Sequence, residues 1–287
     1  MQGITVGNPA ETITMSDILP PVDLIEPAQL AEQLQAPDLM TLDVSRSATY
    51  QQLHIPGAIH IDPSELVSGT PPASGKLPSE LQLNNLFSRI GYHKDKRIVV
   101  YDDEGGGWAG RLIWTLDLLG HKRLGYLNGG LHAWAAEQRP LQREAVQPDR
   151  TDACLSILRP EVRASAEDIL EQLEQNIAIW DARSPAEYNG QKQLAARAGH
   201  IPGAINFEWT QGMDPERHYR LREDLAGRLD SIGLGKNQNI ITHCQTHHRS
   251  GFTYMVARIL GYQNIRAYDG SWSEWGNRTD TPITLAD

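Results

Sequence analysis

The sequence contains little cysteine and no long apolar run. Only Cys154 and Cys244 occur among its 287 residues, and no CxxC pair is present. Two cysteines are too few for a disulfide framework, and both thiols would be free in a reducing compartment. No apolar stretch approaches the roughly 18 residues that a membrane span needs. The N-terminus lacks the basic region and apolar core of a secretory signal. We therefore expect a cytoplasmic protein.

Positive charge is also in short supply. The chain has 26 basic and 36 acidic residues, which gives a formal net charge of −10. Nucleic acids and anionic membranes bind clustered positive charge, so neither is an expected partner. Hydrophobic residues make up 40% of the chain and charged residues 22%, as is usual for a globular protein. Residues 1–14 are polar and without pattern, and we expect them to be disordered or to precede the true start.

The chain is instead rich in internal similarity, because three blocks occur twice in the same order. The pairs are LDVSRSATY (42–50) with WDARSPAEY (180–188), HIPGA (54–58) with HIPGA (200–204), and YLNGGLHAW (126–134) with AYDGSWSEW (267–275). The repeat length of about 140 residues is far above that of solenoid proteins and indicates a duplicated domain. We predict a first domain at 22–142, an exposed linker at 143–157 and a second domain at 158–287.

The two halves differ where reactive residues would be expected. LLGH (118–121) aligns with ILGY (259–262), and the same register places Asp103 opposite Cys244 and Trp108 opposite Arg249. The LDV and WDA blocks place Ser45 opposite Arg183. The first half therefore keeps the framework and lacks the reactive groups.

Short apolar runs alternate with helical patterns in both halves. The predicted strands are 39–44, 97–102 and 123–127 in the first half and 177–182, 239–242 and 264–268 in the second. A helix is expected at 165–175, where Ser165 is a capping residue and acidic residues follow it. A second, at 251–260, is too apolar for a surface helix and should pack on a sheet. This alternation predicts an α/β fold in which each half is a parallel β-sheet with helices on both faces.

The segment HCQTHHRSG (243–251) is the candidate site. Cys244 follows a predicted strand and precedes a predicted helix, where functional residues of parallel sheets gather. Backbone N–H groups of a short loop and the helix dipole can converge on the sulfur, and Arg249 adds a positive charge. Such settings lower the pKa of a cysteine to about 3.5–7.5. A thiolate there could attack a small anionic electrophile and hold the negative persulfide that results.

Two other interpretations of this segment remain open. Cys244 could be an inert buried thiol, although Arg249, His247 and His248 do not suit an apolar site. The cysteine and the histidines also have the atom types that bind zinc, but adjacent histidines do not easily point at one ion. Cys154, in ACLSIL, has no polar neighbours and is predicted to be buried filler. HIPGA is interpreted as a structural turn.

The repeated halves, the DAR…EY block, GHIPGA and CQTHHRSG together resemble the rhodaneses, the thiosulfate sulfurtransferases, over residues 22–287. The nearest resemblance is to bacterial two-domain rhodaneses whose active loop reads CQTHHR. It implies two tandem rhodanese-like domains of which only the second is catalytic. It also implies that Cys244 takes the outer sulfur of thiosulfate as a persulfide and passes it to a thiophilic acceptor such as cyanide. No metal or organic cofactor is implied.

The resemblance also implies roles for individual residues. Cys244 matches the nucleophile, and Arg249 and Arg183 match substrate-binding arginines. Trp209 would line the mouth of the pocket, and Asp181 would orient its region. Gln245, Thr246, His247, His248 and Ser250 would supply the backbone of the active loop. This loop lacks both the lysine of vertebrate-type rhodaneses and the glycine-rich sequence of mercaptopyruvate sulfurtransferases, which makes mercaptopyruvate the less favoured donor.

Other functions are weighed against this one. Related phosphatases use a Cys-x5-Arg loop, whereas this chain has Cys-x4-Arg, a smaller loop that suits sulfur better than phosphate or arsenate. A non-enzymatic docking module would give no reason to combine Cys244, Arg249 and Arg183. A persulfide carrier that serves a thiol protein shares the first half-reaction, so the sequence does not separate it from transfer to cyanide.

Overall fold

The structure is a computed structural model that describes residues 19–173, 175 and 177–285. The expectation about residues 1–14 concerns a segment outside these residues. The first half contains β1 (Val22–Ile25), α1 (Pro27–Ala31), β2 (Leu39–Asp43), α2 (Ser47–Gln52), β3 (Ile59–His60), η1 (Pro63–Leu66), α3 (Glu80–Arg89), β4 (Arg97–Tyr101), α4 (Gly107–Leu118), β5 (Leu124–Leu127) and α5 (Gly130–Ala136).

The second half repeats this plan with additions. It contains η2 (Pro160–Val162), β6 (Arg163–Ala164), α6 (Ala166–Gln172), β7 (Ala178–Asp181), α7 (Pro185–Tyr188), β8 (Ile205–Asn206), η3 (Trp209–Gly212), β9 (Met213–Asp214), η4 (Pro215–Arg217), β10 (Arg220–Leu221), α8 (Leu225–Ser231), β11 (Ile240–His243), α9 (Arg249–Ile259), β12 (Ile265–Tyr268) and α10 (Ser271–Trp275). The six predicted strands are confirmed, as are the two helices, the first with Ser165 as its N-cap.

The two main sheets have the same topology. Within the described residues, the strand orders are β1-β5-β4-β2-β3 and β6-β12-β11-β7-β8, and every pairing in them is parallel. Strands β4 and β11 therefore occupy equivalent central places. The edge strands β3 and β8 have two residues each, too few for a sequence pattern to reveal.

Each sheet is covered on both faces, as the sequence predicts. In the first half, alternate strand residues pack against α3 and α4 on one face and against α1 and α5 on the other. In the second half, α8 and α9 cover one face, and α6 and α10 cover the other. One hydrophobic core contains residues of both α4 and α9 and therefore runs through both halves.

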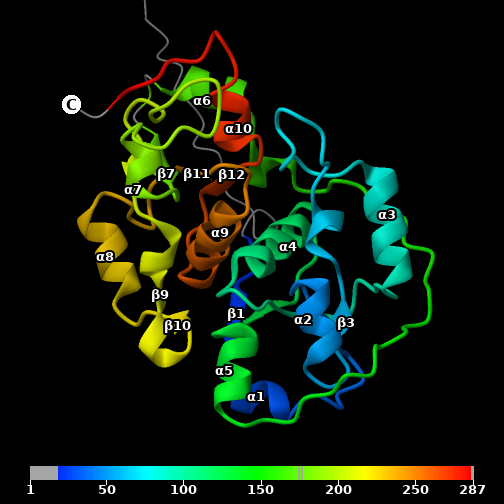
Figure 1. Cartoon of the computed structure of the whole chain (residues 1–287). Coiled ribbons are helices and arrows are strands. Elements are labelled where there is room, and N and C mark those ends of the chain that lie inside the picture. The colour runs from blue at the N-terminus through cyan, green and yellow to red at the C-terminus, as the bar shows by residue number, and fades with distance from the viewer. Residues whose placement is uncertain (1–18, 174, 176, 286–287) are drawn as a thin grey trace, which may run out of the picture.

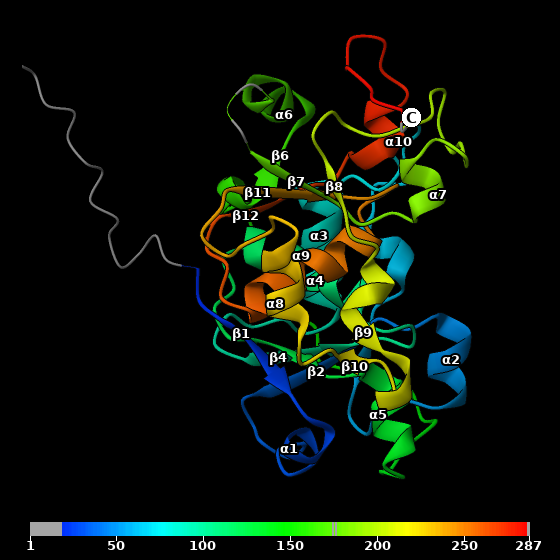
Figure 2. The ribbon, with the colours of Figure 1, turned by 90° about the vertical axis from the view of Figure 1, so that its left-hand side faces the viewer.

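Helices α4 and α9 pack against each other at the centre of the molecule (Figures 1 and 2). A Cβ on Gly110 would collide with the Gly251 carbonyl, and one on Gly251 would lie 2.6 Å from the Arg111 nitrogen. At the other end, the buried Arg258 Nε donates to Asp117 Oδ2 over 3.0 Å. First turn meets first turn and last turn meets last turn, so the helices run in the same direction. The two loops that precede them consequently lie at the same end.

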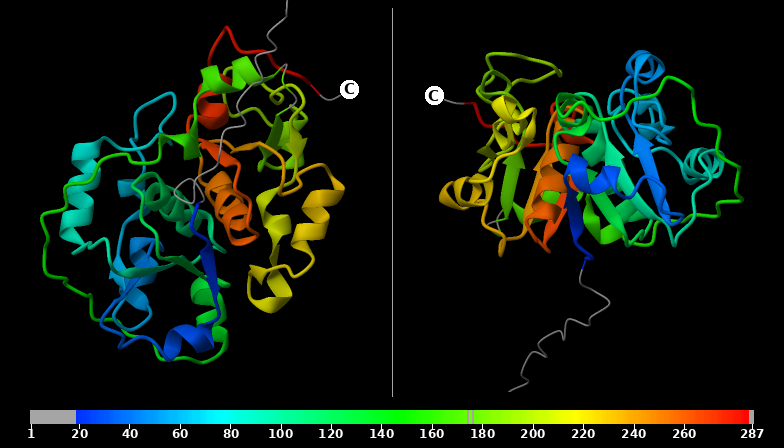
Figure 3. Two further views of the ribbon diagram at one scale, coloured as in Figure 1. Left: turned by 180° about the vertical axis from the view of Figure 1, so that it is seen from behind. Right: turned by 90° about the horizontal axis from the view of Figure 1, so that it is seen from below.

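The linker runs along the outside of the first half, where Figure 3 shows it as the long green trace. Asn84 Nδ2 donates to the Leu155 carbonyl over 3.1 Å, and the Ala153 N–H donates to Ser88 Oγ over 2.9 Å. The prediction that Cys154 is buried is wrong, because its side chain is exposed. Successive side chains of an extended chain point to opposite sides, so Ala153 and Leu155 face the core and Cys154 faces solvent.

Candidate active site

Cys244 lies at the carboxyl edge of the second sheet, between β11 and α9. Its strand is central, and His243 is in register with Asp181 of β7. In a parallel sheet this edge is where loops from several strands meet. We call residues 244–249 the catalytic loop and the equivalent residues 103–108 the first-half loop.

The Cys244 sulfur is buried among hydrogen-bond donors. The side chain is 1% exposed, and the Ser250 hydroxyl donates to Sγ over 3.5 Å. Burial raises the pKa of the thiol, but the Arg249 charge, the Ser250 hydroxyl and the backbone N–H groups of Ser250 and Thr246 outweigh it. The pKa is therefore lowered from its ordinary value. A thiolate is the nucleophilic form of cysteine, so this environment prepares the sulfur to attack an electrophile.

The start of α10 fixes the backbone of Cys244. The Cys244 N–H donates to Ser271 Oγ over 3.2 Å, and the Trp272 N–H donates to the Cys244 carbonyl over 2.9 Å. Ser271 adopts a positive φ of 51°, which is uncommon for a residue other than glycine. Its equivalent in the first half is Gly130, with a φ of 54°. The sequence interpretation missed this role, although Ser271 lies in one of the repeated blocks.

Arg249 is held by a carboxylate that the sequence interpretation also missed. Its Nη1 and Nη2 donate to Glu187 Oε2 and Oε1 over 2.6 and 2.8 Å. Burial raises the pKa of Glu187, but Arg249 and Ser184 outweigh it and lower the pKa to about 2. Such bidentate pairing fixes a guanidinium in orientation as well as charge. In the sequence, Glu187 is the third residue after Ser184 and has the signature of a helix cap, which concealed its second role.

Arg183 occupies a different setting from the one that its predicted role suggests. Its guanidinium is 1% exposed and donates to both carboxylate oxygens of Asp181 and to the Gly199 carbonyl. It also lies over the Trp272 ring, 4.3 Å from the centroid. Because these contacts engage Nε and Nη2 of a buried guanidinium, the geometry favours a positioning role, and direct substrate contact stays a prediction.

His248 lies among side chains from both halves of the chain. Trp209 meets the His248 ring edge to face at 5.4 Å and Phe252 at 5.8 Å. From the first half, Trp108 lies 4.7 Å from the His248 ring, and the Glu104 carboxylate pairs with His248 Nε2. The first-half loop thus reaches the catalytic loop directly. Alignment of the two halves placed Trp108 opposite Arg249 but did not reveal its contact with His248.

The remaining loop residues face neighbouring backbone and side chains. Gln245 Nε2 donates to the Leu194 carbonyl over 3.0 Å. Gly75 of the first half packs so closely on the Thr246 carbonyl that a Cβ there would collide with it. His247 is buried, and its Nδ1 lies 2.7 Å from Ser250 Oγ.

The three histidines near Cys244 do not converge on one point. His243 Nε2 lies 3.6 Å from Asp181, His247 contacts Ser250, and His248 contacts Glu104. Burial lowers the pKa of His243 to about 4 against the opposing charge of Asp181, which leaves this ring neutral near pH 7. Among the described residues, no three His, Cys, Asp or Glu side chains are placed to hold a metal ion.

The first-half loop has the same frame with a different occupant. Asp102, equivalent to His243, is fully buried and accepts from the N–H groups of Glu104, Gly105, Gly106 and Ala109 over 2.8–3.2 Å. Burial, and after it the Glu104 charge, raise the pKa of Asp102 to about 6. The Asp102 carboxylate thus accepts the N–H hydrogen bonds that this loop could otherwise donate to a bound anion.

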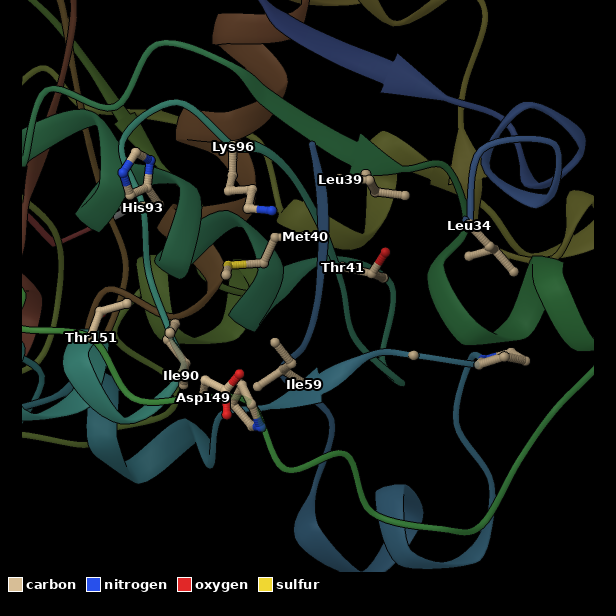
Figure 4. Close-up of a pocket in the computed structure, with 14 residues that line it drawn as sticks. Leu34, Leu39, Met40, Thr41, Ile59, Ile90, His93, Lys96, Asp149 and Thr151 are labelled. Atoms are coloured by element: carbon tan, nitrogen blue, oxygen red, sulfur yellow. The ribbon is translucent and has the colours of Figure 1, made fainter. Parts of the chain in front are cut away.

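A separate cavity of about 580 Å³ lies in the first half, between strand β2 and the linker. Figure 4 shows Leu39, Met40 and Thr41 on one side and Asp149 and Thr151 of the linker on the other. None of the predicted site residues lines it. In the part of the chain that the structure describes, no helix is both long and apolar enough to cross a bilayer.

Known proteins resemble this chain in sequence and in fold. The model of the rhodanese-like domain matches residues 26–137 and 165–278. A thiosulfate sulfurtransferase of Azotobacter vinelandii is 53% identical over 91% of this chain and 97% of its own length. The sulfur carrier protein TtuD of Thermus thermophilus is 33% identical over 92% and 96%. The crystal structure of Tum1 from Saccharomyces cerevisiae superposes with a TM-score of 0.81, at 21% identity, over 94% of this chain and all of that one.

These matches cover both halves in the order that the repeats predict. The fold, with its two parallel sheets of equal strand order, agrees with the family model in each half. The resemblance to the rhodaneses is therefore confirmed, and the chain belongs to the rhodanese family as two rhodanese-like domains in tandem.

Proposed function

We propose that this protein is a sulfurtransferase that takes the outer sulfur of thiosulfate onto Cys244 and passes it to a thiophilic acceptor. The observation that carries the proposal is the Cys244 sulfur itself. It is buried beneath the Ser250 hydroxyl and the backbone N–H groups of Thr246 and Ser250, and its pKa is lowered by Arg249. The name of the Azotobacter relative, at 53% identity, supports the same activity.

The reaction proceeds in two transfers. The Cys244 thiolate attacks the outer sulfur of thiosulfate, a new S–S bond forms, and sulfite leaves with the electron pair of the bond that breaks. An acceptor nucleophile such as cyanide then attacks the outer sulfur of the persulfide. A C–S bond forms, thiocyanate leaves the site, and the electron pair of the S–S bond returns to Cys244 as the thiolate. The enzyme alternates between two covalent forms, which is a ping-pong mechanism.

The side chains around Cys244 divide the work. Arg249 attracts the anionic donor, and its side chain, 18% exposed, is the cation nearest in sequence to the sulfur. Glu187 keeps that guanidinium in place. Trp209 and Trp108 both contact the His248 ring, and Trp209 is proposed to line the mouth of the pocket. Arg183 is assigned a positioning role through Asp181, since its guanidinium is buried.

The proposal needs no metal and no organic cofactor, because the cysteine persulfide carries the sulfur. A nucleophilic thiol works only when reduced, and both cysteines are free thiols. A reducing, cytoplasmic setting is therefore proposed as well. Thiosulfate and cyanide, or another thiophilic acceptor, are the proposed small-molecule partners.

Two variants of the activity share the first chemistry. A persulfide carrier would hand the sulfur to a thiol protein, and the relative from Thermus is named a sulfur carrier protein. A mercaptopyruvate sulfurtransferase would use another donor, but the loop with two histidines and an arginine differs from the glycine-rich loop that the resemblance associates with that donor. Thiosulfate with a small acceptor remains the proposed function.

Intact mass spectrometry tests the proposal directly. The purified protein is measured alone, after thiosulfate and after subsequent cyanide. We expect a gain of the mass of one sulfur atom on Cys244 with thiosulfate and its loss with cyanide. No gain with thiosulfate would overturn the donor assignment, and mercaptopyruvate and then phosphate esters would be measured next. A gain that cyanide does not remove, but a thiol protein does, would favour the carrier.

A further inference from the structure

A buried histidine is linked to the reactive cysteine through Ser250. His247 is fully buried, and its Nδ1 lies 2.7 Å from Ser250 Oγ. The Ser250 hydroxyl in turn donates to Cys244 Sγ over 3.5 Å. The three side chains therefore form a chain that leads from the sulfur into the interface between the halves.

The direction of the hydrogen bonds in this chain follows from the donors available. A hydroxyl has one hydrogen, and Ser250 gives it to the sulfur, so its oxygen accepts from His247 Nδ1–H. Burial, and after it the charge of Arg111, hold the pKa of His247 well below its usual range, so the ring is neutral. Its other nitrogen, Nε2, is then an acceptor, and this buried atom has no partner among the described residues.

The first half fixes the position of the His247 ring. Trp114 of α4 meets it edge to face at 4.4 Å with an interplanar angle of 83°, and the Trp114 indole N–H donates to the Val162 carbonyl over 3.3 Å. Arg111 lies over the Trp114 ring at 4.8 Å and donates to the carbonyls of Gly75 and Leu66. The ring cannot turn without moving this packing.

The backbone of His247 has an unusual conformation. Its φ is 57°, a left-handed value that is uncommon for a residue with a side chain. Asparagine is among the residues that tolerate this region best, and its amide N–H₂ can donate a hydrogen bond. A strained backbone at a reactive loop is evidence of a constraint that the surrounding structure maintains.

We propose that His247 is a positioning residue that orients the Ser250 hydroxyl toward Cys244 and thereby stabilises the thiolate. The proposal rests on Cys244 being the nucleophile of the proposed function. It also assigns the first half a part in the chemistry, because Trp114 holds the histidine. The thiolate is the attacking group of the first transfer and the leaving group of the second, so the hydroxyl assists both.

Other charged and titratable groups face this chain and are held constant in its test. They are Arg249 of α9, Glu187 of α7, Asp181 of β7 and Arg183 after it, His243 of β11, His248 of the catalytic loop, Arg111 of α4 and Arg163 of β6. None of them is altered in the variants that test the histidine.

The test is the pH dependence of Cys244 alkylation by iodoacetamide, a neutral reagent that needs no sulfur donor. Cys154→Ser serves as the background so that one thiol reacts. Ser250→Ala should lower the alkylation rate near neutral pH about tenfold, since a hydrogen bond to a charged group is lost. His247→Ala should lower it about threefold, and His247→Asn should restore most of the wild-type profile.

The control is His218→Asn. His218 is exposed and also has a φ of 57°, so it tests the same replacement in the same backbone conformation away from the site. Its alkylation profile should equal that of the background. If His247→Ala and His247→Asn both leave the profile unchanged while Ser250→Ala shifts it, His247 has no positioning role. Equal losses in both His247 variants would likewise contradict the donor role, because asparagine would then fail to replace it.

A measurement on the unaltered protein covers the case in which a variant does not fold. Nitrogen-15 NMR of labelled histidines reports which ring nitrogen carries the proton. We expect His247 to carry it on Nδ1 in the free enzyme, and a proton on Nε2 would overturn the proposal. Neither experiment uses thiosulfate, so their failure is distinct from a failure of the mass-spectrometric test of sulfur transfer.

Discussion

The first-half loop and the catalytic loop have equal places in equal sheets but different occupants. In the first-half loop, the Asp102 carboxylate accepts from four backbone N–H groups. In the catalytic loop, the equivalent residue is His243, whose neutral ring puts no negative charge there. The N–H groups of Thr246 and Ser250 are thereby available to the Cys244 sulfur. The fold thus supplies donors in both halves, and one side chain decides which anion they receive.

The first half is nonetheless part of the site. Because α4 and α9 run in the same direction, Glu104 and Trp108 reach His248, and Trp114 reaches His247. Because position 103 holds aspartate rather than cysteine, the first half has no nucleophile there. It contributes side chains that contact and support the catalytic loop. Variants on both sides of this contact test the division of roles.

The largest effect is expected from removing the sulfur itself. Cys244→Ser should lower sulfur transfer at least about 1,000-fold, because a hydroxyl at this position is a far poorer nucleophile than a thiolate. Thiosulfate:cyanide turnover measures the loss, and circular dichroism checks that the fold survives. Cys154→Ser is the matched control and should retain full activity, since that thiol lies exposed in the linker. Retained turnover in Cys244→Ser would refute the nucleophile.

Arg249→Ala should lower kcat/KM for thiosulfate about 100-fold. The variant loses the charge that lowers the thiol pKa and leaves the buried Glu187 carboxylate without its partner. Steady-state kinetics measure the loss in kcat/KM, and the pH profile of alkylation measures the change in the thiol pKa. An unchanged kcat/KM would remove Arg249 from the site and weaken the contrast with Trp108, its equivalent.

Gly110→Ala should lower the free energy of unfolding by about 1–3 kcal/mol, because its Cβ would collide with the Gly251 carbonyl where the halves meet. The shift of α4 should also displace the first-half loop and reduce turnover. Gly227→Ala is the control. It lies in α8, where an added Cβ would have no neighbouring atom within 4 Å, so it should stabilise the protein by up to about 1 kcal/mol. Urea denaturation measures both, and equal effects would contradict the close helix packing.

Glu187→Gln should change how stability depends on pH. The folded pKa of Glu187, about 2, lies below its ordinary value of 4.5. The unfolded chain therefore binds more protons between these values, and the stability that the ion pair contributes is full above pH 4.5 and lost as the pH falls toward 2. The difference in unfolding free energy between wild type and Glu187→Gln should shrink over that range. A constant difference would contradict the pairing with Arg249.

The smallest effect is expected from restoring a cysteine to the first half. Asp103→Cys should gain no sulfur from thiosulfate, because the Asp102 carboxylate occupies the N–H groups of that loop. The variant is made together with Cys244→Ser, and its intact mass is measured after thiosulfate. A gain of one sulfur mass would show that the Asp102 carboxylate is not what prevents sulfur transfer in the first half.

The sequence predicted the fold well because its evidence is repeated. The six strands, the capped helix at Ser165 and the equivalence of the halves each have a local pattern that appears twice or follows from alternation. The turn residue His200 makes the same contact with Tyr188 that His54 makes with Tyr50, which agrees with its structural interpretation. Cys154 was the failure, because an apolar hexapeptide does not reveal which of its sides faces the core.

Only part of the candidate site could be predicted from the sequence. Cys244, Ser250 and Arg249 are close in sequence, so their loop places them together. The pairing of Glu187 with Arg249 was missed because Glu187 has the sequence signature of a helix cap. The contact of Ser271 with Cys244 was missed because Ser271 lies in a repeated block that was interpreted as structural. Arg183 lies buried beside Asp181, which no spacing could have indicated.

The order of residues along the chain is enough to show two copies of one α/β domain, of which only the second has a cysteine and an arginine in the short loop after its central strand. These are properties of local pattern. The meeting of the two loops is a property of the folded chain, because it depends on the close packing of α4 on α9 at Gly110 and Gly251. The charge balance at the sulfur is another, since burial and the distances to Arg249 and Ser250 exist only after folding.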